Sequence, residues 1–150
     1  MSSFRLILVD THPGFCIAAE RQFAGLPNVE VVNSGFEELE EFDCLVSPAN
    51  SFGLMDGGID AAIIRFFGES LMERVQERIL RDYLGEQPIG TCLLVDTGHP
   101  RHPFLAHAPT MRVPMEIDRT DYAYLAMWAT LLGTRIVGAW AKNGCRGCPV

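Results

Sequence analysis

Apolar and polar positions follow two patterns along this chain: short apolar runs, and longer segments in which apolar residues recur every three or four positions. Residues 4–9 and residues 29–32 are short apolar runs, which are typical of buried strands. A helix is predicted between them, over residues 15–24, because glycine and proline follow that segment. The chain therefore begins with a predicted strand, helix and strand.

A third apolar run, residues 44–46, leads into residues 47–53, where turn-forming residues dominate. The sequence thus predicts a strand followed directly by a loop. Open α/β sheets bind their ligands in loops at the carboxyl ends of strands, so we expect a ligand site here.

Helical spacing begins after Gly58, where four apolar residues are spaced to share one face: Ile59, Ala62, Ile63 and Phe66. A second helix is predicted from Ser70, because Ser70 and Glu73 have the spacing of a capping box and Gly85 can close the other end. We expect its arginines and glutamates to form a solvated face.

The rest of the chain continues the alternation. Residues 91–95 and 104–108 are predicted strands, residues 121–132 a helix, and residues 136–140 a last strand. Alternating strands and helices predict an α/β class domain with helices on both faces of a central mixed, mostly parallel sheet. We expect residues 1–150 to form a single domain, since neither a linker nor an internal repeat is visible.

Composition narrows the functions that this fold could serve. The 150 residues are 48% hydrophobic and carry a net charge of -7, with a single lysine at position 142. This balance argues against duplex nucleic acid as a partner, and no apolar run is long enough to cross a membrane. We expect a soluble cytoplasmic protein, with the nucleus as an alternative; nothing in the sequence indicates an oligomeric state. A small anion remains compatible, because backbone N–H groups can bind phosphate without a basic surface.

Cysteine and histidine patterns do not predict a metal or a cofactor. The five cysteines are an odd number, and three of them lie within predicted strands or helices. Cys145 and Cys148 have C-x-x-C spacing, but no second pair supplies the four ligands that zinc normally needs. His99 and His102 lie in a proline-flanked loop, and we expect His107 to be a strand residue.

The richest chemistry lies between Asn50 and Asp60. A strand leads to Asn50, and Gly57 and Gly58 open a helix whose free N–H groups and positive dipole end favour an anion. Asp60, in the first turn, adds a carboxylate close to whatever that helix end binds. The alternative interpretation is structural: the glycines form a turn, Asn50 caps it, and Asp60 stabilises the helix start.

At these residues the sequence resembles the macro domain family, whose members bind ADP-ribose. The family's first ligand loop is a strand, then Asn-Ala-Ala-Asn, then Gly-Gly-Val or Gly-Gly-Ile opening a helix. This chain has Ser-Pro-Ala-Asn at 47–50, Gly-Gly-Ile-Asp at 57–60 and His-Ala-Pro at 107–109. The resemblance is strongest over residues 29–132 and implies a three-layer α/β/α macro-domain-like fold.

The resemblance implies a role for each matching residue. Asn50 would hydrogen-bond the distal ribose, with Ser51 beside it among the ligand-binding residues, while Gly57, Gly58 and Ile59 would present their backbone to the diphosphate. In hydrolytic members an aspartate directly after the Gly-Gly-Val step positions the water that attacks the anomeric carbon.

Asp60 holds that position here. The resemblance therefore makes Asn50 and Asp60 the candidate catalytic pair. An ionised carboxylate would orient and polarise the attacking water.

The sequence departs from the family pattern in two places. Many macro domains have Gly-Asp-Ile where this chain has Ser-Gly-Phe-Glu at 34–37, so Phe36 would either stack on the adenine or lie buried without ligand contact. The family's second, glycine-rich phosphate loop would begin near residues 140–147 but has no counterpart, and residues 133–150 are atypical. We expect weak or absent ADP-ribose binding if that loop is essential.

Three functional interpretations stay open. The first is an enzyme that removes ADP-ribose from acidic side chains or other acyl acceptors of proteins, with ADP-ribosylated protein as its partner. The second is a non-catalytic reader of ADP-ribose or a related nucleotide, or an inactive truncated product. The third, a Rossmann-like methyltransferase fragment, is disfavoured because no Gly-x-Gly-x-x-Gly loop follows the first strand.

Overall fold

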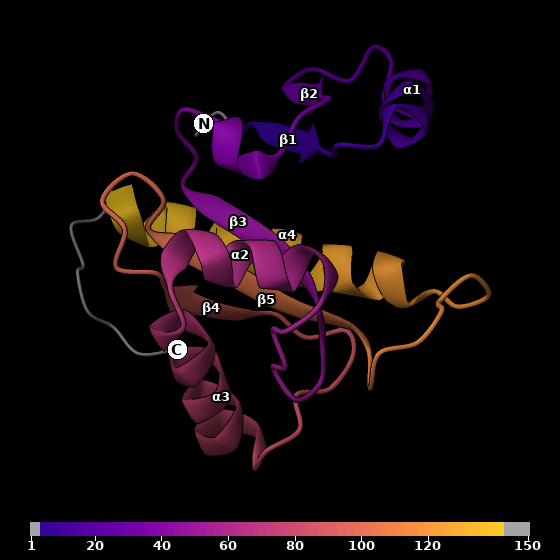
Figure 1. The fold of residues 1–150 in the computed structure, drawn as a ribbon. Helices are drawn as coiled ribbons and strands as arrows, with labels where there is room; N and C mark the ends of the chain where they lie inside the picture. The colour runs from indigo at the N-terminus through magenta and orange to yellow at the C-terminus, as the bar shows by residue number, and fades with distance from the viewer. Residues whose placement is uncertain (1–3, 143–150) are drawn as a thin grey trace. The chain divides into compact units, whose positions relative to one another are not determined.

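The computed structural model describes residues 4–142, and the side chains of residues 4–135 (Figure 1). It divides into two compact units, residues 1–41 and residues 42–150. The C-x-x-C segment at 145–148 lies outside the described residues.

The first unit is a strand–helix–strand segment, as the apolar pattern predicts. β1 (Leu6–Val9) pairs in parallel with β2 (Val29–Val32), and α1 (Pro13–Gln22) connects them. The helix begins two residues earlier than predicted because His12 caps it: its Nδ1 accepts from the backbone N–H of Phe15 at 3.3 Å. A short 3₁₀ helix, η1 (Phe36–Glu38), follows β2.

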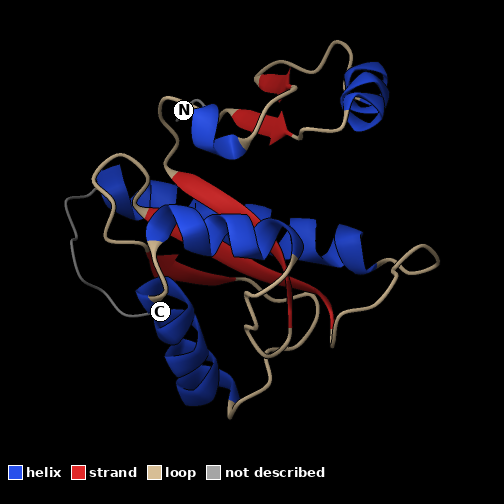
Figure 2. Ribbon diagram, in the orientation of Figure 1, coloured by secondary structure: helices blue, strands red, loops and turns tan. Residues whose placement is uncertain are grey.

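The second unit is built on a mixed three-stranded sheet in the order β3-β5-β4 (Figure 2). β3 (Cys44–Asn50) lies parallel to β5 (Phe104–Met111), and β4 (Leu93–Asp96) lies antiparallel to β5 on its other side. Residues 105–110 of β5 are all buried, which requires cover on both faces of the sheet. In Figure 1, α2 (Gly58–Phe67) lies in front of the sheet and α4 (Tyr122–Lys142) behind it. This unit therefore has the predicted three layers.

Two segments belong to a different type of element from the one predicted. The segment predicted as a loop over 47–53 is strand as far as Asn50, because Pro48 lies in β3, an edge strand of the described sheet, where a missing N–H need not break a ladder. Residues 136–140, predicted as a strand, continue α4, since an apolar run of that length does not distinguish a strand from a helix.

α3 (Ser70–Tyr83) buries Leu71, Val75 and Ile79 but begins differently from the prediction. Its N-cap is Glu69, without a side-chain cap bond, so Ser70 and Glu73 do not form a capping box. At its other end Leu84 is the left-handed C-cap residue, and the N–H of Gly85 donates to the carbonyl of Ile79 at 3.2 Å, so Gly85 helps to close the helix as predicted.

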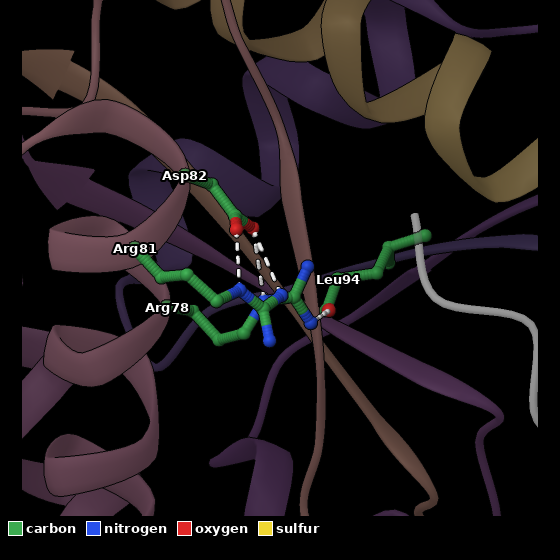
Figure 3. A network of polar contacts seen from close by, with 4 residues as sticks. All are labelled: Arg78, Arg81, Asp82 and Leu94. Carbon is green, nitrogen blue, oxygen red and sulfur yellow. Dashed lines mark hydrogen bonds and ion pairs between the residues drawn. The ribbon is translucent and has the colours of Figure 1, made fainter.

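The arginines of α3 do more than face solvent. Arg78 donates to Asp82 at 3.0 Å and to the backbone carbonyl of Leu94 in β4 at 3.3 Å, while Arg81 donates to the same carboxylate at 2.6 Å (Figure 3). Since β4 is an edge strand of the described sheet, its outer carbonyls need partners other than a strand. Arg78 supplies one to Leu94, and Arg74 donates to the carbonyl of Asp96 at 3.1 Å, so these two arginines hold α3 against β4.

Within residues 4–142, no helix is both long and apolar enough to cross a bilayer.

Candidate functional site

The candidate site begins where β3 ends. Asn50 is only 6% exposed, and its Oδ1 accepts from the backbone N–H groups of Phe52 and Leu54, at 3.1 and 3.2 Å. Its Nδ2 donates to the carbonyl of Leu54 at 2.8 Å. The side chain thus shapes residues 50–54, here named the Asn50 loop. One N–H of the amide is outside these bonds.

The Asn50 loop is fastened on two sides. The backbone N–H of Ser51 donates to the carbonyl of Met111, at 3.1 Å, and the carbonyl of Ser51 accepts from the backbone N–H of Gln87, at 2.8 Å. The strand register shifts between Ala49 and Asn50, so the alternation of side chains breaks just before the loop. Irregularities of this kind re-aim side chains next to binding sites.

The N-terminus of α2 offers an open backbone surface. Gly57 is its N-cap, without a side-chain cap bond, and Gly58 adopts a φ of +54° that favours glycine. A Cβ at either glycine would meet no atom within 4 Å, and Ile59 is 43% exposed. The first N–H groups of a helix have no partner within it, so this end can accept an anion.

Asp60 lies at the same helix end but faces inward. It is 7% exposed, and its Oδ1 accepts from the hydroxyl of Ser47 in β3 at 2.5 Å. Burial raises the pKa of this carboxyl above its ordinary value; the Ser47 hydrogen bond opposes the shift and the nearby charge of Asp56 adds to it. Oδ2 is left to accept from a water or a ribose hydroxyl.

Several polar residues near the site were not assigned a role from the sequence. Ser47 belongs to the quoted Ser-Pro-Ala-Asn motif, so its position was visible although its bond to Asp60 was not. Gln87 is one polar residue in a connection and carries no sequence signal. His107 lies in β5 as predicted, fully buried, and burial lowers its pKa to about 4.

Arg112 is the cation at the outer edge of the Asn50 loop. Its guanidinium lies 5.2 Å from the ring centre of Phe52. The same group makes a bidentate ion pair with the carboxylate of Glu86, at 2.6 and 3.0 Å.

Six of the seven predicted site residues lie in one unit. Asn50, Ser51, Gly57, Gly58, Ile59 and Asp60 all belong to the second unit. Phe36 belongs to the first and is buried, only 3% exposed, so its stacking on adenine stays a prediction. Among residues 4–135, no three His, Cys, Asp or Glu side chains gather as metal ligands would.

Solved structures share this fold. A variant of the Oceanobacillus iheyensis macrodomain, solved with ADPR, superposes with a TM-score of 0.59 at 19% identity, covering 70% of this chain and 57% of that one. The macrodomain of Mycobacterium tuberculosis DarG gives a TM-score of 0.56 at 23% identity, covering 70% and 67%. The predicted macro-domain-like α/β fold is thereby confirmed.

Sequence comparison identifies the family. An uncharacterized protein of Aquifex aeolicus is 33% identical over 87 residues, which are 58% of this chain and 48% of that protein. The chain thus matches about half the length of this curated relative. The model of the macro domain family matches residues 46–132, a segment that contains most of β3 and all of the Asn50 loop, α2 and β5. The chain therefore belongs to the macro domain family.

Proposed function

We propose that this chain binds ADP-ribose with the Asn50 loop and the N-terminus of α2, and that it removes ADP-ribose from acidic protein side chains. The observation that carries the proposal is the open backbone of Gly57 and Gly58 at the start of the same helix that places Asp60 against β3. The diphosphate would lie on the backbone N–H groups of this helix end, and Asn50 would donate to the distal ribose with its remaining N–H.

Spacing in a structural relative supports the assignment of individual residues. Solved variants of the Oceanobacillus iheyensis macrodomain replace a glycine, an aspartate three positions after it, and an asparagine seven positions before it. Gly57, Asp60 and Asn50 are the same residue types at the same intervals.

In the proposed reaction, water attacks the anomeric carbon of the distal ribose. The bond from that carbon to the acceptor oxygen breaks, which releases ADP-ribose and a free carboxylic acid. Asp60 would orient the water through Oδ2, while Ser47 holds Oδ1. A carboxyl whose pKa is raised is a stronger base than an ordinary aspartate, so the environment of Asp60 suits this role.

One observation favours the second candidate, a reader that binds ADP-ribose without hydrolysing it. Asp60 is buried and already accepts a hydrogen bond from Ser47. Most of the hydrogen bonds that the Asn50 side chain can make are made within its own loop. In that case both residues would serve the shape of the site alone.

Calorimetric titration with ADP-ribose, combined with release of ADP-ribose from a modified protein, separates the two. For the enzyme we expect Asp60→Ala to retain binding and lose release, and Asn50→Ala to lose both. Glu73→Gln, at an exposed carboxylate on α3 outside the site, is the matched control. Binding without release by the unmodified chain would identify the reader, and absence of binding would refute both candidates.

A further inference from the structure

Gln87 lies in the connection between α3 and β4 and is completely buried, although it is a polar residue in a loop. Buried amides are retained only where their hydrogen bonds are made. Gln87 makes them with both its side chain and its backbone, and its partners lie in the Asn50 loop, in β5 and in its own connection.

The bonds of Gln87 run in two directions. Its backbone N–H donates to the carbonyl of Ser51, at 2.8 Å, and so reaches the Asn50 loop. Its side-chain Nε2 donates to the carbonyl of His107 and to the hydroxyl of Thr91, each at 3.1 Å. One residue thereby connects the loop to the middle of β5.

Oε1, the remaining polar atom of the Gln87 amide, determines which nitrogen of His107 carries the proton. Because Nε2 of Gln87 donates in both its bonds, Oε1 is an acceptor, and the 2.7 Å contact to Nδ1 of His107 places the imidazole proton on Nδ1. Nε2 of His107 is buried without a hydrogen-bond partner among the described residues, so a proton there would be left without an acceptor. Burial also lowers the pKa of the ring to about 4, so at neutral pH the ring is neutral and its proton lies on Nδ1.

His107 also lies next to the carboxylate side of the site. It is the register partner of Ser47 on β3, and partners in a parallel pair point to the same face of the sheet. Ser47 in turn donates to Asp60. Buried polar groups thus run beneath the site from α2, across the sheet, to the Asn50 loop.

We propose that Gln87 is a positioning residue, whose amide and backbone N–H hold the Asn50 loop against β5 in the conformation that receives ADP-ribose. The inference rests on the proposed function for its ligand, but its loop-holding part can be measured without one. Gln87 itself touches no ligand, so its effect must travel through Ser51 and Asn50.

The experiment compares Gln87→Met with Val95→Ala. The methionine keeps much of the volume and removes the side-chain hydrogen bonds, whereas Val95 is a buried residue of β4 without a described bond to the loop. Two quantities are measured in each variant of the 150-residue chain: ADP-ribose affinity by calorimetry, and hydrogen exchange at the amides of Phe52 and Leu54, which are bonded to Asn50. Thr91→Val, which removes a single partner of Gln87, serves if Gln87→Met does not fold.

We expect Gln87→Met to weaken ADP-ribose binding about tenfold and to accelerate exchange at both amides by a similar factor. Val95→Ala should change neither the ADP-ribose affinity nor the exchange rates by more than about twofold, even where it lowers thermal stability as much as Gln87→Met does. Equal effects in the two variants, or unchanged exchange in Gln87→Met, would overturn the inference. If the unmodified chain does not bind ADP-ribose, the proposed function fails, and the exchange comparison still decides whether Gln87 holds the loop.

Discussion

At the scale of single residues, His107 predicts how stability depends on pH. Its pKa is lowered from 6.5 to about 4 by burial, so folding favours the neutral ring. Its contribution to stability is complete above pH 6.5, where the unfolded chain is also neutral, and is lost as the pH falls through about 4. The free energy of unfolding should therefore drop by on the order of 3 kcal/mol across this window.

His107→Gln provides the control, because glutamine does not titrate and can still donate to Gln87. Urea unfolding at pH 7, 6, 5 and 4 should show a steeper loss in the parent chain than in the variant. Parallel curves would mean that His107 can be protonated in the folded protein without cost.

Asp60 should change stability with pH in the opposite direction to His107. Burial raises its pKa, so folding favours the protonated carboxyl; this contribution to stability is present below pH 3.8 and is lost as the pH rises through the raised pKa. Above the raised pKa the folded chain carries a buried carboxylate. Asp60→Asn removes that charge and keeps an oxygen for Ser47, so it should raise the free energy of unfolding by about 1 kcal/mol at pH 7.

Unfolding at two pH values tests this effect. The advantage of Asp60→Asn should vanish as the pH falls toward 3.8. A variant that is less stable than the parent at pH 7 would show that the carboxylate is fully compensated in the folded state.

Residue types at the site could be predicted, but their partners could not. Asn50 and Asp60 are recognisable because a motif places them at a strand end and a helix start. The bond from Ser47 to Asp60 and the one from His107 to Gln87 join residues 13 and 20 positions apart. They depend on which strands pair and in which register, and local sequence spacing does not contain that information.

At the scale of elements, Gly53 couples the Asn50 loop to α3. Its φ is +65°, and a Cβ there would lie 2.9 Å from Cδ1 of Ile79 and 3.0 Å from Cγ1 of Val75. Gly53→Ala would therefore combine backbone strain with overlap in the core, for a loss of about 2–3 kcal/mol.

Gly98→Ala is the matched control, because Gly98 has a similar φ of +75° and no atom within 4 Å of an added Cβ. It should cost about 1 kcal/mol in thermal unfolding experiments. Equal losses in the two variants would mean that α3 yields to the extra methyl group.

The N-terminus of α2 predicts a charge effect on binding. Ile59→Glu places a carboxylate in the exposed first turn, where the proposed diphosphate would lie, whereas Ile59→Gln has nearly the same shape without the charge. Relative to Ile59→Gln, we expect Ile59→Glu to bind ADP-ribose about 3- to 10-fold more weakly in calorimetry, with stability changed by less than about 0.5 kcal/mol. Equal affinities would place the diphosphate away from this helix end.

Element types followed from periodicity wherever a segment was long and its pattern clear, as in α2 and α3. The errors lie where local rules compete with tertiary context. Proline usually ends a strand, but Pro48 lies within an edge strand of the described sheet. The apolar run at residues 136–140 is typical of a strand, but in the structure it extends a helix.

At the scale of the whole molecule, the sequence predicted a mixed α/β fold because helices and strands alternate throughout the chain. It did not predict that the chain divides into two compact units at residue 41, since no change of composition marks that point. Contacts between distant segments define such units, and apolar periodicity reports only whether a residue is buried.

Net charge leads to a prediction for ligand association. The chain carries a charge of -7, and the proposed diphosphate site is made of backbone N–H groups, so long-range forces repel an anionic ligand that the site itself attracts. Salt screens the long-range repulsion more strongly than contacts at the site. The association rate of ADP-ribose should therefore rise roughly two- to threefold between 20 and 300 mM NaCl in stopped-flow measurements.

Uncharged adenosine is the control ligand, because its association should not respond to salt. A fall in the ADP-ribose rate with salt would mean that side-chain cations guide the diphosphate. Arg112 would then be the first residue to test, since it lies exposed at the edge of the Asn50 loop. If side-chain cations guide the diphosphate, Arg112→Gln should remove the salt dependence of the association rate. If the backbone alone holds the diphosphate, Arg112→Gln should leave that dependence unchanged. The sign of the change in association rate with salt therefore distinguishes a backbone site from a side-chain site.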